Sequence, residues 1–280
     1  MNPGPDAPES RRSGERSASS ARSLLPFFAL VGALSVPFYV LGAFTRIDLL
    51  PRLPISAVAT VCPAAAALIL SRRQGGDSAA WSLLRGAVDI HSIIPMPTIA
   101  AAILVAPAAE WVSYLVPSAL ASSTHITPIS PGQLVALATA FLVAAIGEEL
   151  GWSGYALGRL QSQSPMLRVG LEIGVAWAAW HVLPLVSVGR SAEWVAWWAI
   201  GTIAQRVVFV WLYRATGRNV GVVALSHALR NLVWMLIPTF GSEYDPRADA
   251  IATIAVAAAV VAISGRVERA GASANTGRGA

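Results

Sequence analysis

Residues 134–152 read LVALATAFLVAAIGEELGW, an apolar run that ends in two adjacent carboxylates, Glu148 and Glu149. A charged side chain in hydrocarbon costs roughly 2.5 to 3.5 kcal/mol on insertion scales, so these residues are expected to face a polar interior and to act there. Consecutive side chains on a helix diverge by about 100°, which indicates two different roles. The alternative is that the pair marks the cytoplasmic end of a helix, although the apolar pattern continues beyond it through Tyr155 and Leu160.

Two further apolar runs contain polar residues in the same way. VAWAAWHVLPLV contains His181, and VVALSHALRNLVWML contains His227 and Asn231. Because His227 and Asn231 are four residues apart, a helix presents both side chains on one face. Each of these residues could also make an ordinary hydrogen bond between helices, and that reading stays open for both segments.

Together these side chains supply what peptide-bond hydrolysis requires: a base for water, imidazoles that bind metal or stabilise charge, and an amide donor for an oxyanion. The soluble zinc-protease motif HExxH is absent. Any divalent metal, such as zinc, must therefore be bound between helices, and the candidate ligands are Glu148, His181 and His227. A single cysteine, Cys62, excludes an internal disulfide and a cysteine-based metal cluster.

The composition is that of a membrane protein. Of 280 residues, 55% are hydrophobic and 12% are charged, and the mean hydropathy is +0.59. Long uncharged stretches separated by short polar ones are typical of membrane spans of about 20 residues. The predicted fold is all-α, a polytopic membrane bundle of about eight transmembrane helices with both termini cytoplasmic. The predicted spans are 24–44, 54–71, 91–115, 132–158, 168–187, 193–214, 219–238 and 249–265.

The distribution of arginine predicts this orientation, because loops on the cytoplasmic side carry an excess of basic residues. All 20 basic residues are arginine. The arginines that fall on the side of the N-terminus are Arg11, Arg12, Arg16, Arg22, Arg72, Arg73, Arg85, Arg159, Arg168, Arg214, Arg218, Arg266, Arg269 and Arg278. Those on the other side are Arg46, Arg52, Arg190 and Arg247. The basic residues are scattered over inner loops, so no nucleic-acid partner is expected.

The ends of the chain differ from the middle. Residues 1–22 are rich in Pro, Ser, Arg and Glu and are expected to form a disordered cytoplasmic tail, as are residues 266–280. The first apolar run is too long for a signal-peptide core and no small-residue cleavage site follows it, so it is predicted to be an uncleaved span. Residues 23–265 form the predicted transmembrane domain.

At these residues the chain resembles the CPBP family of intramembrane proteases, which includes type II CAAX prenyl endopeptidases and bacterial bacteriocin-processing and immunity homologues. The family signatures are EExxxR, FxxxH and HxxxN or HxxxD on successive helices. Here they match Glu148 and Glu149 in EELGWS, WAAWH ending at His181, and HALRN from His227 to Asn231. The resemblance covers most of residues 62–234.

The resemblance implies an eight-helix membrane fold whose active site opens toward the cytoplasmic leaflet. It implies that Glu148, with His181, activates water, and that His227 and Asn231 form an oxyanion hole or a metal-assisted site. Eukaryotic members remove the last three residues of prenylated proteins. Bacterial members mostly lack such substrates, so another membrane protein or peptide is the expected partner.

Two positions depart from the family pattern. Ser153 stands where EExxxR ends in arginine, which removes the partner of Glu149 from its own helix. An unpaired buried carboxylate is costly, and we hypothesise that Arg206 or Arg230 replaces the missing arginine, with Glu110 and Glu172 as competitors. Trp177 stands in place of the motif phenylalanine and keeps an aromatic ring beside the histidine.

The resulting functional prediction is an intramembrane endopeptidase in the bacterial cytoplasmic membrane, which hydrolyses a peptide bond of a membrane-associated protein or peptide. One alternative is a catalytically impaired scaffold or immunity-type binding protein of the same fold, a reading that depends on Ser153. Another is a transporter that uses the glutamates as proton relays. No repeated halves or paired broken helices support that second alternative.

Overall fold

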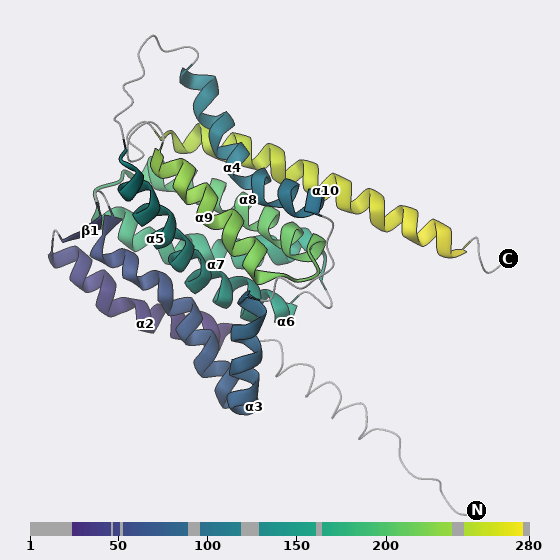
Figure 1. Cartoon of the computed structure of the whole chain (residues 1–280), viewed down its shortest axis with the longest axis horizontal. Helices are drawn as coiled ribbons and strands as arrows, with labels where there is room; N and C mark the ends of the chain where they lie inside the picture. Colours follow the sequence, from purple (N-terminus) through teal and green to yellow (C-terminus); the bar gives the residue numbers. More distant parts are fainter. Residues whose placement is uncertain are drawn as a thin grey trace, which may run out of the picture.

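In the computed structural model the chain is a bundle of long helices (Figure 1). The structure describes residues 24–45, 47–50, 53–88, 96–118, 129–160, 164–236 and 244–276. The elements are α2 (Leu25–Phe44), strands β1 (Asp48–Leu50) and β2 (Leu53–Pro54), a 3₁₀ segment (Ile55–Val61), α3 (Cys62–Val88), α4 (Met96–Ser118), α5 (Pro131–Glu149), a π-helical segment (Leu150–Leu157), α6 (Gly158–Leu160), α7 (Met166–Ser187), α8 (Ala192–Ala215), α9 (Val220–Leu236) and α10 (Pro246–Thr276).

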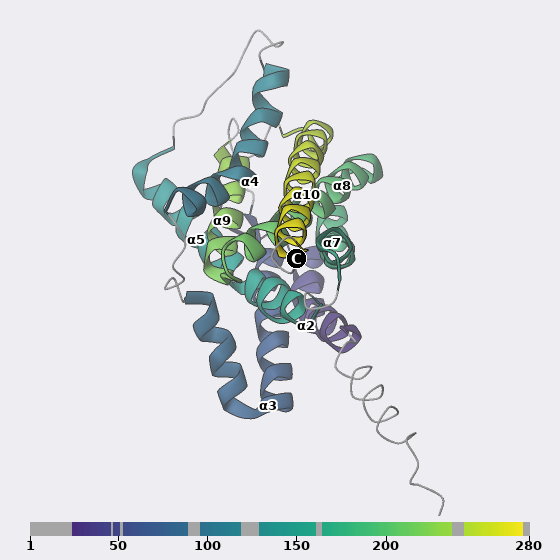
Figure 2. The same cartoon turned by 90° about the vertical axis from the view of Figure 1, so that its right-hand side faces the viewer.

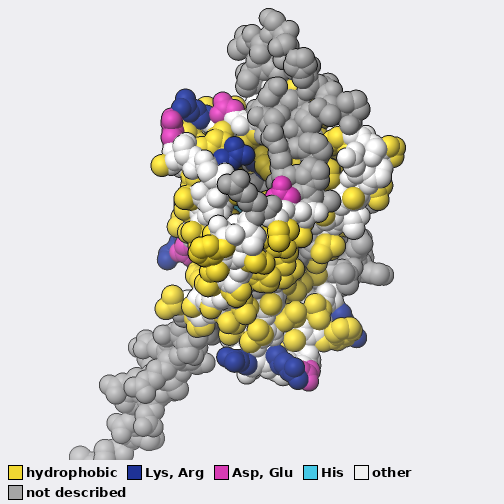
Figure 3. Space-filling model, turned by 90° about the vertical axis from the view of Figure 1, so that its left-hand side faces the viewer, with side chains coloured by type: hydrophobic (Ala, Val, Ile, Leu, Met, Phe, Trp, Pro, Cys, Tyr) yellow, Lys and Arg dark blue, Asp and Glu magenta, His cyan; other side chains and the backbone are white. Residues whose placement is uncertain are grey.

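The helices confirm the predicted class of a multi-pass helical membrane protein. Each of the eight predicted spans coincides with a helix of the described residues. Six helical segments are long and apolar enough to cross a membrane, and α9 is a shorter apolar helix. Figure 3 shows hydrophobic side chains gathered over the middle of one face, with charged side chains above and below them. The prediction for residues 1–22 lies outside the described residues.

Three details differ from the sequence prediction. A short antiparallel hairpin, β1 with β2, follows α2. Helix α3 runs beyond the predicted end of its span, with a sharp kink where Gly76 adopts φ 72°, a conformation that glycine adopts without a steric penalty. Figure 2 shows the two arms of α3 on either side of that kink. Helix α10 continues to Thr276, so residues 266–276 are helical where a disordered tail was predicted; this stretch is rich in alanine, which favours helix.

The helices alternate in direction between two ends of the bundle. At one end the beginnings of α2 and α7 lie together with the end of α6, because Leu24, Leu160 and Leu171 line a common hollow. At the other end the β1–β2 hairpin lies with the connection between α7 and α8, since Asp48 and Arg190 line the same cavity. This arrangement packs α5 against α9 and α7 against α8, and α5, α7 and α9, the three helices with polar residues, line one cavity.

The segment around the glutamates packs tightly against the start of α3. A Cβ at Gly147 would lie 2.8 Å from the Thr60 carbonyl oxygen, and one at Gly151 would lie 2.5 Å from Pro63. Glycine is therefore required at both positions for the two backbones to approach. Directly after Glu149 the helix widens into the π-helical segment, a distortion often found at functional sites.

Candidate functional site

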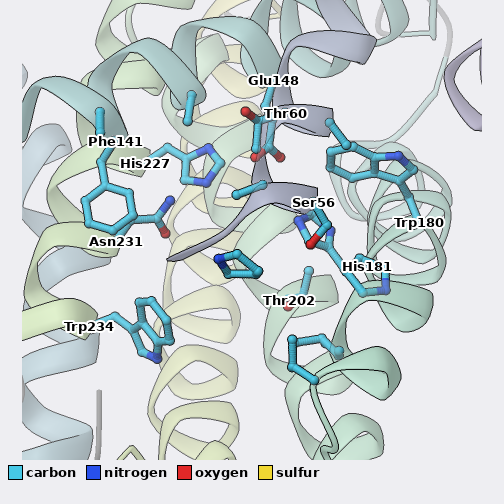
Figure 4. Close-up of a pocket in the computed structure, with 18 of the residues that line it drawn as sticks. Ser56, Thr60, Phe141, Glu148, Trp180, His181, Thr202, His227, Asn231 and Trp234 are labelled. Carbon is cyan, nitrogen blue, oxygen red and sulfur yellow. The ribbon is translucent and has the colours of Figure 1, made fainter. Parts of the chain in front are cut away.

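The predicted site residues line one cavity of about 860 Å³ inside the bundle. Glu148 reaches it from α5, His181 from α7, and His227 and Asn231 from α9. Figure 4 shows these four side chains arranged around a common space, with Trp234 farther along α9. Three helices distant in sequence thus direct a carboxylate, two imidazoles and an amide toward the same volume. Glu149 is fully buried and does not line the cavity.

Glu148 is held in place by a tryptophan. Its Oε2 accepts a hydrogen bond of 2.7 Å from the indole Nε1 of Trp177, one helix away, and the carboxylate is almost fully buried. A charge-assisted hydrogen bond of this kind restricts the carboxylate to one orientation. The second oxygen of Glu148 is not fixed by that bond, so one oxygen is anchored while the carboxylate still faces the cavity.

Glu149 points the other way, as expected for consecutive helical residues, and is paired in the protein interior. Arg206 of α8 binds both carboxylate oxygens, with Nη1 2.7 Å from Oε2 and Nη2 3.1 Å from Oε1. His227 Nδ1 lies 3.0 Å from Oε1. The Ser153 hydroxyl donates to Oε2. The two glutamates therefore have different surroundings, one at the cavity wall and one in a buried ion pair.

The missing motif arginine is replaced in space by Arg206. Its guanidinium binds Glu149 in the bidentate geometry that favours such pairs, and it also lies 4.1 Å from the centroid of the Trp177 ring. The competing candidate Arg230 instead pairs with Glu110 and Asp249. Glu172 pairs with Arg168 on the surface. The hypothesis of a replacement is thus supported for Arg206 and not for Arg230.

The hydrogen bond of His181 determines its tautomer. Its Nδ1 lies 2.9 Å from the backbone oxygen of Trp177, one turn earlier. A carbonyl oxygen only accepts hydrogen bonds, so Nδ1 carries the proton and Nε2 of the neutral ring keeps its lone pair. The ring also meets Trp180 at 4.5 Å and Trp198 at 5.2 Å between centroids. His181 therefore offers an acceptor nitrogen from a fixed, aromatic setting.

The same reasoning assigns the tautomer of His227. Its Nδ1 faces the Glu149 carboxylate, which only accepts, so Nδ1 donates and Nε2 is the remaining ring nitrogen. The Trp177 indole lies between the two histidines, with centroid distances of 5.6 Å to His181 and 5.4 Å to His227. Asn231, one turn after His227, adds an amide to the same wall.

The predicted metal ligands do not form a compact set. Within the described residues, no three His, Cys, Asp or Glu side chains lie close enough together to hold a metal ion. Glu148 has one oxygen bound to the Trp177 indole, and each histidine uses Nδ1 for another partner and keeps Nε2, so the spacing of the donors, and not their chemistry, argues against such a site. The donors present thus do not fit a three-ligand site in this arrangement, and the metal remains a prediction.

A second buried charge cluster stands at the cavity's edge. Arg230 binds Asp249 of α10 through 2.7 Å contacts and Glu110 of α4 at 2.9 Å. Tyr244, just before α10, donates to Asp249 at 2.8 Å. Burial, with the neighbouring Asp249 carboxylate, raises the pKa of the Tyr244 phenol well above its usual value, so it remains a donor. These contacts tie α4, α9 and α10 together.

Sequence reasoning missed several cavity residues. The hydroxyls of Ser56 and Thr60 come from the 3₁₀ segment and that of Thr202 from α8, and all three line the wall near the predicted site (Figure 4). No motif or spacing marks them, because isolated hydroxyls are common in membrane helices. Trp177 was expected only to keep an aromatic ring beside the histidine, and its hydrogen bond to Glu148 was not predicted. The only feature of the sequence that could have indicated this bond is the N–H donor that tryptophan has and phenylalanine lacks.

Comparisons with known proteins point to one family. Residues 130–233 match the family model described as type II CAAX prenyl endopeptidase Rce1-like. The chain is also 26% identical over 154 residues to CAAX prenyl protease 2 of Methanococcus maripaludis, a match that covers 50% of this chain and 56% of that protein. The chain thus spans about half the length of the curated relative that it matches. The matched region contains every predicted site residue.

Proposed function

We propose that this chain belongs to the CAAX prenyl endopeptidase family, as the match over residues 130–233 supports, and that it is an intramembrane endopeptidase. It would hydrolyse a peptide bond of a membrane-associated protein or peptide, in the bacterial cytoplasmic membrane. The observation that supports this most is the convergence of Glu148, His181, His227 and Asn231 on one cavity from three helices.

In the proposed reaction, Glu148 is the general base. It takes a proton from a water molecule while the water oxygen bonds to the carbonyl carbon of the substrate. His181 accepts the second water proton in a hydrogen bond through Nε2 and so orients the attack. The Trp177 indole keeps the Glu148 carboxylate in position during this step. A general base of this kind contributes about 10²- to 10⁴-fold to the rate.

The developing oxyanion then needs donors. Asn231 supplies an amide N–H, and His227, whose ring is oriented by the Glu149 carboxylate, lies beside it on the same wall of the cavity. When the carbon–nitrogen bond breaks, Glu148 returns its proton to the leaving nitrogen. Glu149 acts through His227 and does not contact the substrate, so it is a positioning residue, as is Arg206.

The proposed alternative, a catalytically impaired scaffold, depends on the loss of the motif arginine at Ser153. The ion pair between Arg206 and Glu149 weakens that reason, because the buried carboxylate has a bidentate cationic partner from α8. Both proposals share the fold and differ only in turnover.

The deciding experiment is substrate trapping with Glu148→Gln, which keeps the shape of the side chain and removes the base. Peptides that co-purify from native membranes with this variant, but not with wild type, are identified and synthesised. We expect purified wild type to cleave them and Glu148→Gln to bind them without cleavage. Glu172→Gln, which changes a surface carboxylate on α7, is the matched control and keeps full activity. Equal cleavage by Glu148→Gln would eliminate the proposed base, and trapped peptides that wild type leaves intact would favour the scaffold.

A further inference from the structure

The two ends of the bundle differ in charge. At the end where α2 begins and α6 ends, the described arginines include Arg72, Arg73, Arg85, Arg159, Arg168, Arg214, Arg218 and Arg266. At the opposite end the described arginines are Arg190 and Arg247, accompanied by Asp48, Glu193 and Asp245. Contacts confirm that these groups share an end: Arg214 binds the Ser164 carbonyl before α7, and Arg247 binds Glu193 at the start of α8.

The cavity opens at the arginine-poor end. Its wall includes Asp48 and Leu49 of the hairpin, Val188 and Arg190 of the connection between α7 and α8, and Tyr244 before α10. Asp48, Leu49, Val188 and Arg190 are exposed. From this mouth the wall runs inward to Glu148 and the two histidines, and it also includes Val61 and Val143, which are exposed on the side of the bundle.

Loops rich in arginine remain in the cytoplasm because basic residues resist translocation. We infer that the catalytic cavity is entered from the extracytoplasmic face of the membrane, and that its substrate is an exported or outward-facing polypeptide segment. This inference builds on the proposed function and names its substrate class. It also departs from the orientation that the family resemblance implies, an opening toward the cytoplasmic leaflet.

The mouth also indicates the kind of segment that fits. Trp194 and Trp234 line it together with Tyr244, whose ring lies 5.8 Å from Trp194 and 6.3 Å from Trp234 between centroids. Arg190 stacks on Trp194 at 4.5 Å. Aromatic side chains bind apolar groups by burying apolar surface, so the preferred segment is apolar near the cleaved bond.

Orientation is tested with single cysteines, because the chain has only one natural cysteine, the buried Cys62. In a Cys62→Ala background, Ala192→Cys marks the mouth end and Ser78→Cys marks the arginine-rich end; both positions are exposed and neither lines the cavity. We expect a membrane-impermeant maleimide to label Ala192→Cys in intact cells and Ser78→Cys only after permeabilisation. The reverse pattern would overturn the inference.

Access is tested separately with right-side-out and inverted membrane vesicles that contain wild type. Both receive the same water-soluble, quenched fluorescent peptide library of mixed apolar sequence. We expect cleavage by right-side-out vesicles and none by inverted vesicles until detergent is added, with Glu148→Gln silent throughout. Cleavage by inverted vesicles alone would overturn the inference. Absence of cleavage by both kinds of vesicle, also after detergent is added, would count against the proposed endopeptidase. The cysteine labelling would still decide the orientation.

Discussion

At the scale of single residues, Trp177 connects the parts of the candidate site. It donates a hydrogen bond to Glu148, meets both histidines edge-on and lies under the Arg206 guanidinium. A phenylalanine, the residue of the family motif, would keep the ring contacts and lose the hydrogen bond. The two departures from the motif, at residues 153 and 177, thus meet in one place, because Arg206 binds Glu149 and stacks on Trp177.

Trp177→Phe tests this arrangement. A hydrogen bond to a charged group contributes about 1.5 to 3 kcal/mol, so its loss should lower kcat about tenfold to a hundredfold. Because phenylalanine keeps an aromatic ring at the cavity wall, KM should stay near the wild-type value. The measurement is steady-state cleavage of a trapped peptide, with Trp211→Phe, which lies away from the cavity on α8, as the control. An unchanged kcat would show that the indole N–H does not orient the base.

Arg206→Ala tests the replacement of the motif arginine. It would leave Glu149 buried without its bidentate partner, and breaking a buried ion pair from one side typically destabilises a protein by about 3 to 5 kcal/mol. We expect a large drop in the thermal unfolding midpoint in detergent and loss of cleavage. Arg168→Ala breaks a surface pair with Glu172 and should change the midpoint little. A midpoint equal to that of wild type would rule out Arg206 as the essential partner.

At the scale of elements, the close approach of the glutamate segment to α3 determines the shape of the cavity wall. Gly151 lies against Pro63 with no space for a side chain. This contact presses the π-helical segment onto the start of α3, next to the 3₁₀ segment that supplies Ser56 and Thr60 to the cavity. Backbone packing between two elements therefore helps to fix where Glu148 points.

Gly151→Ala should disturb this packing, while Gly158→Ala, seven residues later in the same continuous helix, should not. A Cβ at Gly151 meets Pro63 backbone and side-chain atoms at 2.5 to 2.6 Å, whereas a Cβ at Gly158 meets no atom within 4 Å. Overpacking of this kind costs about 1 to 3 kcal/mol. The measurements are the unfolding midpoint and the cleavage rate. Equal behaviour of the two variants would contradict the close contact.

At the scale of the whole molecule, the helices enclose a cavity whose wall is aromatic. Five of the ten tryptophans line it, namely Trp177, Trp180, Trp194, Trp198 and Trp234. Trp194 lies at the mouth. The intrinsic tryptophan fluorescence should therefore report whether the cavity is occupied, since these rings surround any bound segment.

Binding of an apolar peptide should therefore change the intrinsic fluorescence of Glu148→Gln, which binds without cleavage. We expect a saturable change on titration with a trapped peptide. Trp198→Phe should reduce its amplitude, because Trp198 lines the cavity. Trp81→Phe should leave the amplitude unchanged, because Trp81 is exposed on α3. A signal lost with Trp81 and kept with Trp198 would place the peptide elsewhere.

Much of this molecule was predictable from the sequence. Membrane spans are local properties, because about 20 apolar residues suffice to cross a bilayer, so the eight helices agree with prediction. The polar residues at 148, 149, 181, 227 and 231 were identifiable because such groups are rare in apolar runs. The opposite directions of Glu148 and Glu149 followed from helical geometry alone. The end of α10 was not predicted, because helix propensity is weak and boundaries depend on context.

The amino-acid sequence by itself determined where the apolar helices lie along the chain and which of them contain ionisable side chains. Only the tertiary structure decided which groups are partners: Arg206 lies 57 residues from Glu149, and Trp177 lies 29 residues from Glu148. It also decided that the cavity mouth lies at the arginine-poor end. The physical reason is that hydrophobicity and helical periodicity act along the chain, whereas ion pairs, hydrogen bonds and cavities depend on how separate helices pack in space.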